Sequence, residues 1–461
     1  MHARRPTTPR RPTMPSVKIV EVARVALPAA ALDPPPQLLC LSALDAPWLA
    51  FPRLQRVFIF EDAHHPHPPP FASRVASLRA SLAATLARFP PLAGTIVFLP
   101  DTGDAAIDCS GSGPGVRFLV AEADDADAAR LAGDADHDVE TFRRLVPLLD
   151  AAVLPAEALA VQATRLRGGV AVGVALHHAV VDGRSLWRFL EAWAAACRGD
   201  PTDTTAPSFD RTAVALPGGQ ELARSTLRKY MPDLPLLPQQ SAVGPIFPRR
   251  TFAVTELQIS RLKQRIADDQ TRRAGASDVE PPSSFVAVAA LSWASYIRSK
   301  HPVAISADHD VYVFCFVDCR GRRGFDPPVS ESYFGSCLTG CLAKALARDL
   351  LADDGVAAAA VAVQKEVRRV AEDPLAMWDW MSLSSSLPLD RVLNMSGSPR
   401  FRAYEAADFG WGAPSRTELV SMENPGQVVL VAAKGGGVQA SAVMHADHMD
   451  TFCSHFGNFL G

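Results

Sequence analysis

The most informative pattern of apolar residues predicts a strand that runs directly into an amphipathic helix. Over 170–176, valine and leucine occupy every second position and small residues fill the positions between them. This alternation is typical of a buried β-strand. Over 186–193, large apolar residues recur at helical spacing. The short segment 177–183 therefore connects the carboxyl end of a strand to the start of a helix.

The same two periodicities predict further elements in both halves of the chain. Strands are expected over 53–60, 311–318, 428–433 and 438–444, and the last two flank three glycines as a β-hairpin. Helices are expected over 71–89, 285–300 and 447–460, and over 340–371 with a break near 353–355. Ser283 or Ser284 is placed to cap the 285–300 helix. The acidic run 122–140 is expected to be a solvated surface.

Proline content divides the chain into two parts. Eight prolines between 201 and 248 oppose regular structure, so we expect a long crossover over 201–250. It separates a domain at 16–200 from a domain at 251–461, and both mix strands with helices. The expected fold class is therefore α/β, with two similar domains. Residues 1–15, rich in arginine and proline, are expected to be a disordered extension, and Met1 and Met14 are both acceptable starts.

Composition narrows the range of functions. The chain has 461 residues, 48% of them hydrophobic, which predicts a globular protein. With 46 Lys and Arg against 49 Asp and Glu, the net charge of −3 gives no reason to expect nucleic acid. The apolar stretches are too short to span a bilayer, so no membrane partner is expected. We expect a cytoplasmic monomer.

The cysteines do not predict a disulfide framework or a metal site. Eight cysteines in a chain of this length are too few for a disulfide scaffold. Cys315 and Cys319 are four residues apart, as are Cys337 and Cys341, and neither pair has the spacing of a zinc knuckle. We expect buried free thiols and no bound metal.

The turn after the 170–176 strand carries the first candidate for chemistry. It reads His177-His178-Ala-Val-Val-Asp182-Gly183, which places histidine at the carboxyl end of a strand, where α/β sheets often bind ligands. Histidine is the side chain best suited to take a proton near neutral pH. Asp182 can hold the turn or fix the imidazole tautomer, and Gly183 permits a tight bend. A satisfied structural histidine that caps the helix remains an alternative.

The second distinctive string is Asp408-Phe-Gly-Trp411-Gly412. Its Asp-Phe-Gly start is found in protein kinases, but neither a kinase glycine-rich loop nor a His-Arg-Asp loop accompanies it, so the kinase interpretation fails. The string predicts a turn in which Gly410 and Gly412 relieve backbone strain. The aspartate and the aromatic side chains would anchor that turn.

Together these motifs resemble the BAHD family of plant acyl-CoA-dependent acyltransferases. His178-xxx-Asp182-Gly183 followed by Asp408-Phe-Gly-Trp-Gly412 is the family's pair of signatures, and the resemblance extends over essentially the whole chain after Met14. Val317-Asp-Cys-Arg320-Gly-Arg322 is similar to its Asn/Asp-x-Arg element. Tyr333-Phe-Gly-Ser-Cys337 is similar to the Tyr-Phe-Gly-Asn-Cys signature of its anthocyanin and flavonoid clade, with Ser336 in place of Asn. Ser396-Gly-Ser-Pro-Arg400 resembles the malonyltransferase pattern.

The resemblance implies a fold of two chloramphenicol-acetyltransferase-like domains with a channel between them. Acyl-CoA would be the co-substrate, and a phenolic glycoside the acceptor. His178 would act as the general base, with no covalent acyl-enzyme. The resemblance also implies that Asp182 pairs with Arg320 as a structural group at the site, together with Gly183. Asp408 is often described as catalytic in this family, but we interpret it as structural, as we do Gly410, Trp411 and Gly412.

Several alternatives stay open. Malonyl-CoA is the favoured donor, and a hydroxycinnamoyl or other aromatic acyl-CoA is the alternative. Arg184 and Arg188 are candidate cations for an acidic acyl group, and a helix amino terminus near Ser283-Ser284 is a candidate site for CoA phosphates. The His-His-xxx-Asp string also fits condensation domains of peptide synthetases, and counting from His177 it fits glycerolipid acyltransferases. A non-enzymatic small-molecule-binding member of the family is a further alternative.

Overall fold

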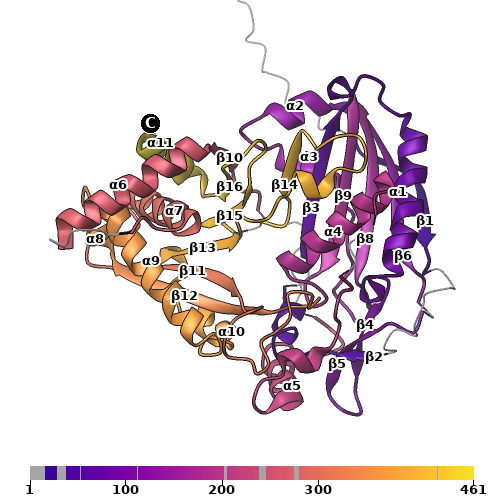
Figure 1. Cartoon of the computed structure of the whole chain (residues 1–461), viewed down its shortest axis with the longest axis horizontal. Coiled ribbons are helices and arrows are strands. Elements are labelled where there is room, and N and C mark those ends of the chain that lie inside the picture. Colours follow the sequence, from indigo (N-terminus) through magenta and orange to yellow (C-terminus); the bar gives the residue numbers. More distant parts are fainter. Residues whose placement is uncertain are drawn as a thin grey trace, which may run out of the picture.

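The structure is a computed structural model that describes residues 16–27, 38–51, 53–111, 113–201, 205–237, 245–274, 280–422 and 424–460. The extension expected at 1–15 lies outside the described residues. Within them, each half of the chain forms a six-stranded mixed sheet with flanking helices (Figure 1). The predicted α/β class with a mixed sheet in each half is confirmed.

The strands fall into three sheets. Their bounds are β1 (Lys18–Val25), β2 (Leu38–Cys40), β3 (Arg53–Glu61), β4 (Thr95–Leu99), β5 (Asp104–Asp108), β6 (Val116–Asp127), β7 (Ala156–Glu157), β8 (Leu159–Arg167), β9 (Gly169–His177), β10 (Arg249–Val254), β11 (Asp310–Asp318), β12 (Leu338–Leu346), β13 (Val392–Gly397), β14 (Arg416–Leu419), β15 (Gln427–Ala432) and β16 (Val438–Val443). The first sheet has the order β1-β6-β8-β9-β3-β14, the second β10-β16-β15-β13-β11-β12, and a small third sheet β2-β5-β4-β7.

The helices cover these sheets. Their bounds are α1 (Phe71–Leu86), α2 (Ala128–Gly133), α3 (Val139–Arg144), α4 (Gly183–Arg198), α5 (Gly219–Tyr230), α6 (Glu256–Ala274), α7 (Ser284–Lys300), α8 (Ala347–Leu351), α9 (Gly355–Glu372), α10 (Trp380–Ser385) and α11 (Ala446–Leu460). Among the helices of the described residues, none combines the length and the apolar character that crossing a bilayer requires.

One strand ties the two halves together. Strand β14 comes from the carboxyl-terminal half, yet it pairs antiparallel with β3 in the first sheet. Figure 1 shows it in the yellow-orange of the late sequence beside the indigo and magenta strands. The division of the chain at 201–250 stays a prediction.

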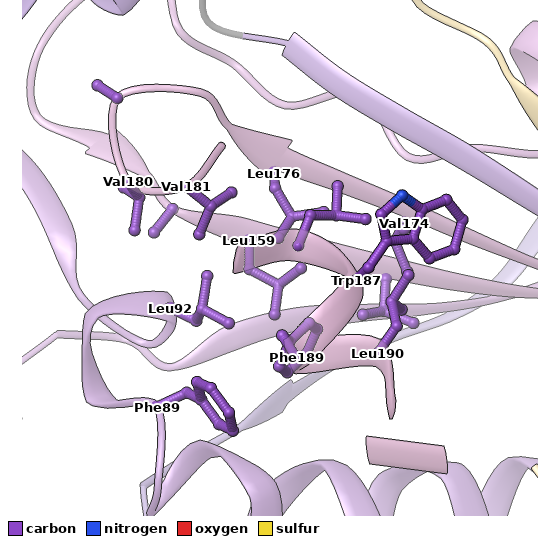
Figure 2. Packing of buried hydrophobic residues seen from close by; sticks show 14 of the residues in the cluster. Phe89, Leu92, Leu159, Val174, Leu176, Val180, Val181, Trp187, Phe189 and Leu190 are labelled. Carbon is purple, nitrogen blue, oxygen red and sulfur yellow. The ribbon is translucent and has the colours of Figure 1, made fainter. Parts of the chain in front are cut away.

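The strand and helix around 177–183 form as predicted. Helix α4 begins after Asp182, whose side chain accepts a hydrogen bond from the Ser185 N–H, and it ends at Gly199 in a left-handed conformation. Figure 2 shows Trp187, Phe189 and Leu190 of this helix packed over strand residues of the first sheet. The apolar face of α4 is buried, so the helix fixes the direction in which the turn before it points.

Three expectations need correction. The stretch 338–346 is strand β12 rather than the start of a helix, because it pairs with β11 along nine residues. The crossover 201–250 contains helix α5, which fits between Pro217 and Pro232 and is held by an ion pair from Arg224 to Asp104 at 2.8 Å. The acidic run 122–140 is not purely surface. It ends β6 and forms α2, and Ala123, Ala126, Ala128 and Leu131 are buried between exposed or half-exposed carboxylates.

Candidate active site

The site begins where β9 ends. His177 is the last residue of β9, and the turn that follows leads to Asp182 at the N-cap of α4. The Val180 N–H donates to the His177 carbonyl at 3.0 Å, and the His177 N–H donates to the Ala158 carbonyl at 2.8 Å. The turn is thus fixed by backbone bonds before any side chain contributes.

The two adjacent histidines lie in different environments. His177 is fully buried, and burial lowers its pKa to about 3. His178 is half-buried. Its pKa is lowered to about 4, mainly by burial, while the backbone carbonyls of His178 and Val181 and the Asp182 carboxylate oppose the shift. The Arg56 charge adds to the lowering. At neutral pH His178 is therefore an uncharged imidazole that is able to accept a proton.

Asp182 and Arg320 form the buried ion pair that the family resemblance implied. The Arg320 guanidinium donates to the Asp182 carboxylate at 2.8 Å, and both side chains are fully buried. Asp182 also accepts hydrogen bonds from the backbone N–H groups of Ser185 at 2.9 Å and Cys337 at 3.1 Å. Burial alone would raise the pKa of Asp182, but Arg320 and these hydrogen bonds hold the pKa below its usual range.

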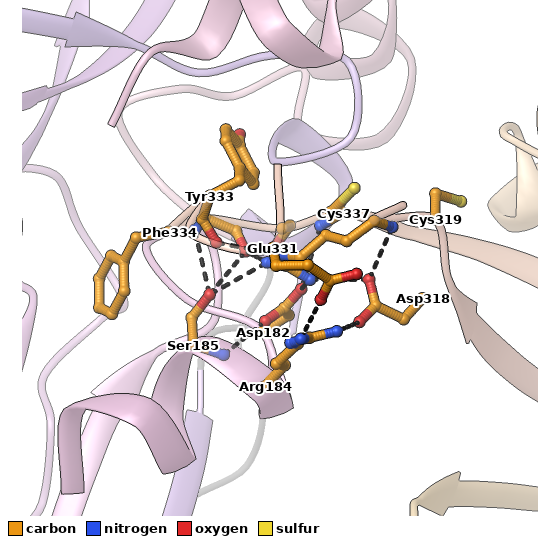
Figure 3. A network of polar contacts seen from close by, with 12 residues as sticks. Asp182, Arg184, Ser185, Asp318, Cys319, Glu331, Tyr333, Phe334 and Cys337 are labelled. Atoms are coloured by element: carbon orange, nitrogen blue, oxygen red, sulfur yellow. Dashed lines mark hydrogen bonds and ion pairs between the residues drawn. The ribbon is translucent and has the colours of Figure 1, made fainter. Parts of the chain in front are cut away.

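Arg320 uses its remaining donors to hold the 333–337 segment. It donates to the carbonyls of Tyr333 at 3.0 Å and Gly335 at 2.8 Å, and to the Ser185 hydroxyl at 3.1 Å. It also pairs with Asp318 at 2.9 Å, and Figure 3 shows this polar network at the start of α4. The guanidinium thus joins the start of α4 to two segments of the carboxyl-terminal half.

The 333–337 segment reaches the backbone of His178. The Ser336 hydroxyl donates to the His178 carbonyl at 3.3 Å, and the Ser336 N–H donates to the Asp45 carboxylate at 3.0 Å. Asp45 directly precedes a short 3-10 helix, Ala46–Leu49, that carries Trp48. Ser336 therefore links the 177–183 turn to the helix that places Trp48.

Trp48 lies on one face of the His178 ring. The ring centroids are 3.7 Å apart and the planes are 11° from parallel. Trp48 also contacts Phe316 of β11 at 5.0 Å and Trp380 of α10 at 4.9 Å between centroids. Trp380 extends this aromatic cluster to the exposed Phe51 at 5.9 Å. An aromatic surface therefore runs from His178 towards solvent and draws residues from both halves.

The cations next to the turn already have partners. Arg184 donates to Asp318 at 3.1 Å and also pairs with Glu331, as Figure 3 shows. Arg188 donates to the backbone carbonyl of Thr205 at 2.9 Å. Neither arginine is positioned by the described contacts as an open site for an acyl carboxylate.

The 408–412 string lies at the other end of α4. The Arg198 guanidinium, on the last residue of α4, donates to the Asp408 carbonyl, and Asp182 caps the first turn. A helix of 16 residues is about 24 Å long. The Asp408 carboxylate accepts from the Gly410 N–H at 2.9 Å, and Phe409 packs against Trp193 at 4.8 Å. The string therefore anchors the end of α4 that is distant from His178.

Both glycines of this string adopt a left-handed backbone conformation. Gly410 has φ of 93° and Gly412 has φ of 81°. These values favour glycine over residues with a Cβ atom. Trp411 lies under the Arg74 guanidinium at 5.1 Å. The predicted turn is present at 408–412.

One cavity of the described residues lies in the carboxyl-terminal half. It has a volume of about 480 Å³ and is lined by one face of α6, including Lys263 and Ser260, by Ser284 at the amino terminus of α7, by Pro399 and by Gly437. The Ser283 hydroxyl caps α7 by accepting from the Val286 N–H. A lysine and a helix amino terminus both favour an anionic ligand.

The eight cysteines are free thiols. Cys315 lies directly opposite Cys341 across strands β11 and β12, and the Cys319 N–H donates to the Cys337 carbonyl at 2.9 Å. Across the described part of the chain, no cluster of three or more His, Cys, Asp or Glu residues is arranged to hold a metal ion.

Sequence reasoning missed part of this site. Trp48, Asp45 and Trp380 were not singled out, and Arg56 was not considered. A proline in the first turn marks the 46–49 helix, but nothing in the local pattern indicates its contact with His178. Ser336 was singled out only because it replaces the Asn of the Tyr-Phe-Gly-Asn-Cys signature, whereas the structure shows that its hydroxyl donates a hydrogen bond to the His178 carbonyl.

The chain matches known proteins along nearly its full length. The model of the Transferase family matches residues 18–458. Phenolic glucoside malonyltransferase 2 of Arabidopsis thaliana is 28% identical over 448 residues, which cover 91% of this chain and 93% of the relative. Coumaroyl-CoA:anthocyanidin 3-O-glucoside-6''-O-coumaroyltransferase 2, also of Arabidopsis thaliana, is 25% identical and covers 90% of this chain and 91% of the relative. The crystal structure of vinorine synthase has the same fold, with a TM-score of 0.72, 23% identity, and coverage of 96% of this chain and 98% of that one.

Proposed function

The chain belongs to the Transferase family and is an acyltransferase, and from this premise we propose that it moves a malonyl group from malonyl-CoA to a sugar hydroxyl of a phenolic or flavonoid glycoside. Membership confirms the resemblance to the BAHD acyltransferases. The donor is supported by the relative named as a phenolic glucoside malonyltransferase and by the malonyltransferase-like string at 396–400.

The observation that carries the proposal is the environment of His178. Its low pKa keeps the imidazole neutral, and the bonds of the turn and of Ser336 fix the backbone around it. In the proposed reaction His178 takes the proton from the acceptor hydroxyl as the hydroxyl oxygen attacks the thioester carbonyl. The C–S bond then breaks, an ester forms, and the proton leaves with the CoA thiol. No covalent acyl-enzyme is formed.

Asp182 and Arg320 are structural groups in this proposal. Their direct partners are each other, Ser185, Asp318 and the backbone of 333–337, and the side chain of Arg320 is fully enclosed. A buried, fully hydrogen-bonded guanidinium has no donor left for a reacting atom. The pair instead holds the start of α4 against the carboxyl-terminal half, which fixes the turn that carries His178.

The cavity beside α6 and α7 is our candidate for the nucleotide end of CoA. CoA carries phosphates, and Lys263 together with the amino terminus of α7 supplies positive charge to a lining that also holds Glu256. Pro399 of the malonyltransferase-like string also lines this cavity, which connects that string to donor binding. The helix terminus is the one that the sequence suggested for CoA phosphates.

The aromatic cluster supports a phenolic partner. Trp48, Phe316 and Trp380 present ring surfaces next to His178, and such surfaces favour flat aromatic groups. If the donor is malonyl-CoA, which has no aromatic acyl group, the aromatic ring that binds to this cluster is that of the acceptor. An aromatic acyl-CoA is the second candidate donor, because another relative, 25% identical to this chain, is named as a coumaroyltransferase.

The proposal is tested by release of CoA thiol from purified protein. Malonyl-CoA, p-coumaroyl-CoA and acetyl-CoA are each offered with a panel of phenolic glucosides. We expect release with malonyl-CoA, and a loss of about 100-fold or more in His178→Ala. His445→Ala, an exposed histidine outside the site, is the matched control and should retain activity. Release that persists in His178→Ala would show that His178 is not the base. Binding of CoA without release from any pair would favour a non-enzymatic binding protein.

A further inference from the structure

We propose that Arg56 binds the terminal carboxylate of the acyl group and thereby sets a preference for an acidic acyl donor. This inference rests on the proposed function and names a specificity residue within it. Arg56 lies in β3, outside both sequence motifs, and it was not one of the cations that the sequence suggested.

The strand register places Arg56 near the turn that carries His178. Strand β3 pairs antiparallel with β9, so that Arg53 lies opposite His177 and Arg56 lies opposite Val174. Alternate residues of a strand share a face, so Arg56 is on the same face as Phe58. Phe58 contacts Trp187 of α4 at 6.2 Å between centroids, which identifies this as the face that α4 covers. Arg56 is therefore beneath the start of α4, on the side of the turn.

Electrostatics agrees with this placement. The Arg56 charge is one of the causes that lower the pKa of His178, which is the direction expected for a cation on the same side of the sheet as the imidazole. The carboxylate of a malonyl group is separated from the thioester carbonyl by a single methylene. A cation that binds it must therefore lie close to the reacting carbon and to the base. The phosphates of CoA are kept away from this position by the long pantetheine arm.

Arg56 is buried without a carboxylate partner. Its exposed fraction is 6%, and its Nε has no hydrogen-bond partner. One terminal nitrogen donates to the Gln55 carbonyl at 2.8 Å, and no described carboxylate forms an ion pair with it. Burial lowers the pKa of Arg56 to about 9, with no acidic group among the causes that could oppose the shift.

Three of the other buried arginines of the described chain have a carboxylate partner. Arg74 pairs with Asp62 at 2.7 Å, Arg320 with Asp182, and Arg416 with a glutamate at 3.0 Å. Arg249 donates to three backbone carbonyls, those of residues 419, 420 and 422. Arg56 differs from Arg74, Arg320 and Arg416 in having no carboxylate partner among the described residues.

A buried guanidinium in this state is suited to a carboxylate ligand. An uncompensated charge in the interior is costly, and a bidentate carboxylate supplies both the opposite charge and two acceptors. Arg184, the sequence-based candidate, already has Asp318 and Glu331 as partners, so it has less to gain from an acyl carboxylate. The geometry thus favours Arg56 as the determinant of donor charge.

The test compares acidic and neutral donors in Arg56→Gln and in the matched control Arg184→Gln. The kcat/KM values for malonyl-CoA, acetyl-CoA and n-butyryl-CoA are measured with one acceptor, and affinities for the same donors are measured by calorimetry. We expect Arg56→Gln to lower the ratio of malonyl-CoA to acetyl-CoA on the order of 30-fold, in kcat/KM and in affinity. Arg184→Gln should leave this ratio unchanged. Any effect of Arg56 on the His178 pKa cancels in the ratio, because all donors use the same base.

An unchanged ratio in Arg56→Gln, or an equal loss with all three donors, would overturn the proposal, because the residue would then be structural. If Arg56→Gln does not fold, the ratio of malonyl-CoA to acetyl-CoA is measured in Arg56→Lys instead. Lysine keeps the positive charge but cannot bind a carboxylate in a bidentate manner, so the proposal requires this ratio to fall. Calorimetry separates this inference from the proposed function. Suppose that wild type binds malonyl-CoA more tightly than acetyl-CoA, that Arg56→Gln loses this preference, and that no donor is turned over. Arg56 would then still be the carboxylate site, but the proposed acyl transfer would be wrong.

Discussion

The indole ring of Trp48 is stacked on the imidazole ring of His178, with centroids 3.7 Å apart and planes 11° from parallel. Trp48 is itself 5% exposed, so it shields one face of the imidazole from water. Shielding of this kind is the leading cause of the low pKa of His178. The stack also restricts rotation of the imidazole, because a tilted ring would clash with the indole.

Replacing Trp48 by alanine should therefore change the pH dependence of the reaction. Removal of the indole hydrates the imidazole, and the pKa of His178 should rise from about 4 towards the ordinary histidine value of about 6.5. A base must be unprotonated to act, so the acid limb of kcat/KM moves to higher pH. We expect a wild-type profile that is flat from pH 8 to about 5.5, and a Trp48→Ala profile that falls below about pH 6.5.

Trp48→Phe is the control for this measurement. Phenylalanine retains an apolar ring over His178, so its profile should stay close to that of the wild type while the rate falls modestly. A Trp48→Ala enzyme that loses rate equally at every pH would contradict the link between the stack and the pKa. The role of Trp48 would then be limited to shape.

The Asp182–Arg320 pair should contribute to stability as well as to rate. Asp182→Asn leaves a fully buried guanidinium with less compensation, and breaking such a pair costs about 3–5 kcal/mol. The measurement is the free energy of unfolding from urea denaturation. The control is Glu221→Gln, which removes the exposed pair with Arg228 and should leave the free energy of unfolding close to that of wild type.

The sign of the pH effect at Asp182 is fixed by its lowered pKa. Its stabilising effect is complete above the pKa of an unfolded aspartate, about 3.9, and is lost only as the pH falls through the lower folded-state pKa. The difference between wild type and Asp182→Asn should thus be the same at pH 5.5 and pH 7.5. An Asp182→Asn protein that is as stable as wild type but slower would contradict the assignment of Asp182 as a structural group.

The elements that the sequence predicted correctly have strong local patterns. Strand β9 and helix α4 follow from period-two and helical spacing, and the β15–β16 hairpin follows from two apolar runs around three glycines. Strand β12 was predicted wrongly because its alanines and leucines favour helix. Pairing with β11 along nine residues overrides that local preference.

Only the site residues that belong to a recognisable sequence motif could be predicted. His178, Asp182 and Arg320 lie together as expected, although Arg320 is 138 residues from Asp182 in the chain. The contacts of Trp48 and Ser336 with His178 depend on how the two halves pack, and no local periodicity encodes them. Arg56 stands in an ordinary strand pattern, and its unpartnered Nε becomes visible only when its surroundings are known.

The 408–412 turn should be required for stability and dispensable for chemistry. Asp408→Asn keeps an oxygen acceptor for the Gly410 N–H, so kcat should change by less than about 3-fold. Gly410→Ala should cost about 1–3 kcal/mol of unfolding free energy because φ is 93°. Space is not the cause, since the nearest atom to an added Cβ is the Arg198 Cγ at 3.5 Å.

Gly457→Ala is the matched control for that backbone effect. Gly457 lies in α11 with nothing within 4 Å of an added Cβ, so the substitution should be neutral or slightly stabilising. Thermal unfolding and kcat are measured on the same preparations. An Asp408→Asn protein that is fully stable and inactive would place the Asp408 carboxylate in the chemistry.

Stability should fall in mildly acidic solution because of a buried histidine between the two halves. The His137 side chain is 1% exposed, and its Nε2 lies 2.7 Å from the Thr251 hydroxyl of β10 and 3.4 Å from the Glu418 carboxylate of β14. Burial lowers the pKa of His137 to about 4, although Glu418 opposes the shift. In the unfolded chain the same group titrates near 6.5.

The unfolded state therefore binds more protons than the native state between pH 6.5 and 4, and the free energy of unfolding falls over that window as the pH is lowered. The slope is about 1.4 kcal/mol per pH unit for one histidine, so wild type should lose about 1.4 kcal/mol from His137 between pH 7.5 and 5.5. His137→Gln should be less stable at pH 7.5 but lose about 1.4 kcal/mol less than wild type over that interval. Urea denaturation followed by tryptophan fluorescence measures both values, and His445→Gln, at an exposed histidine, is the control for loss of an imidazole. If wild type and His137→Gln lose the same stability between the two pH values, His137 is not the group that titrates.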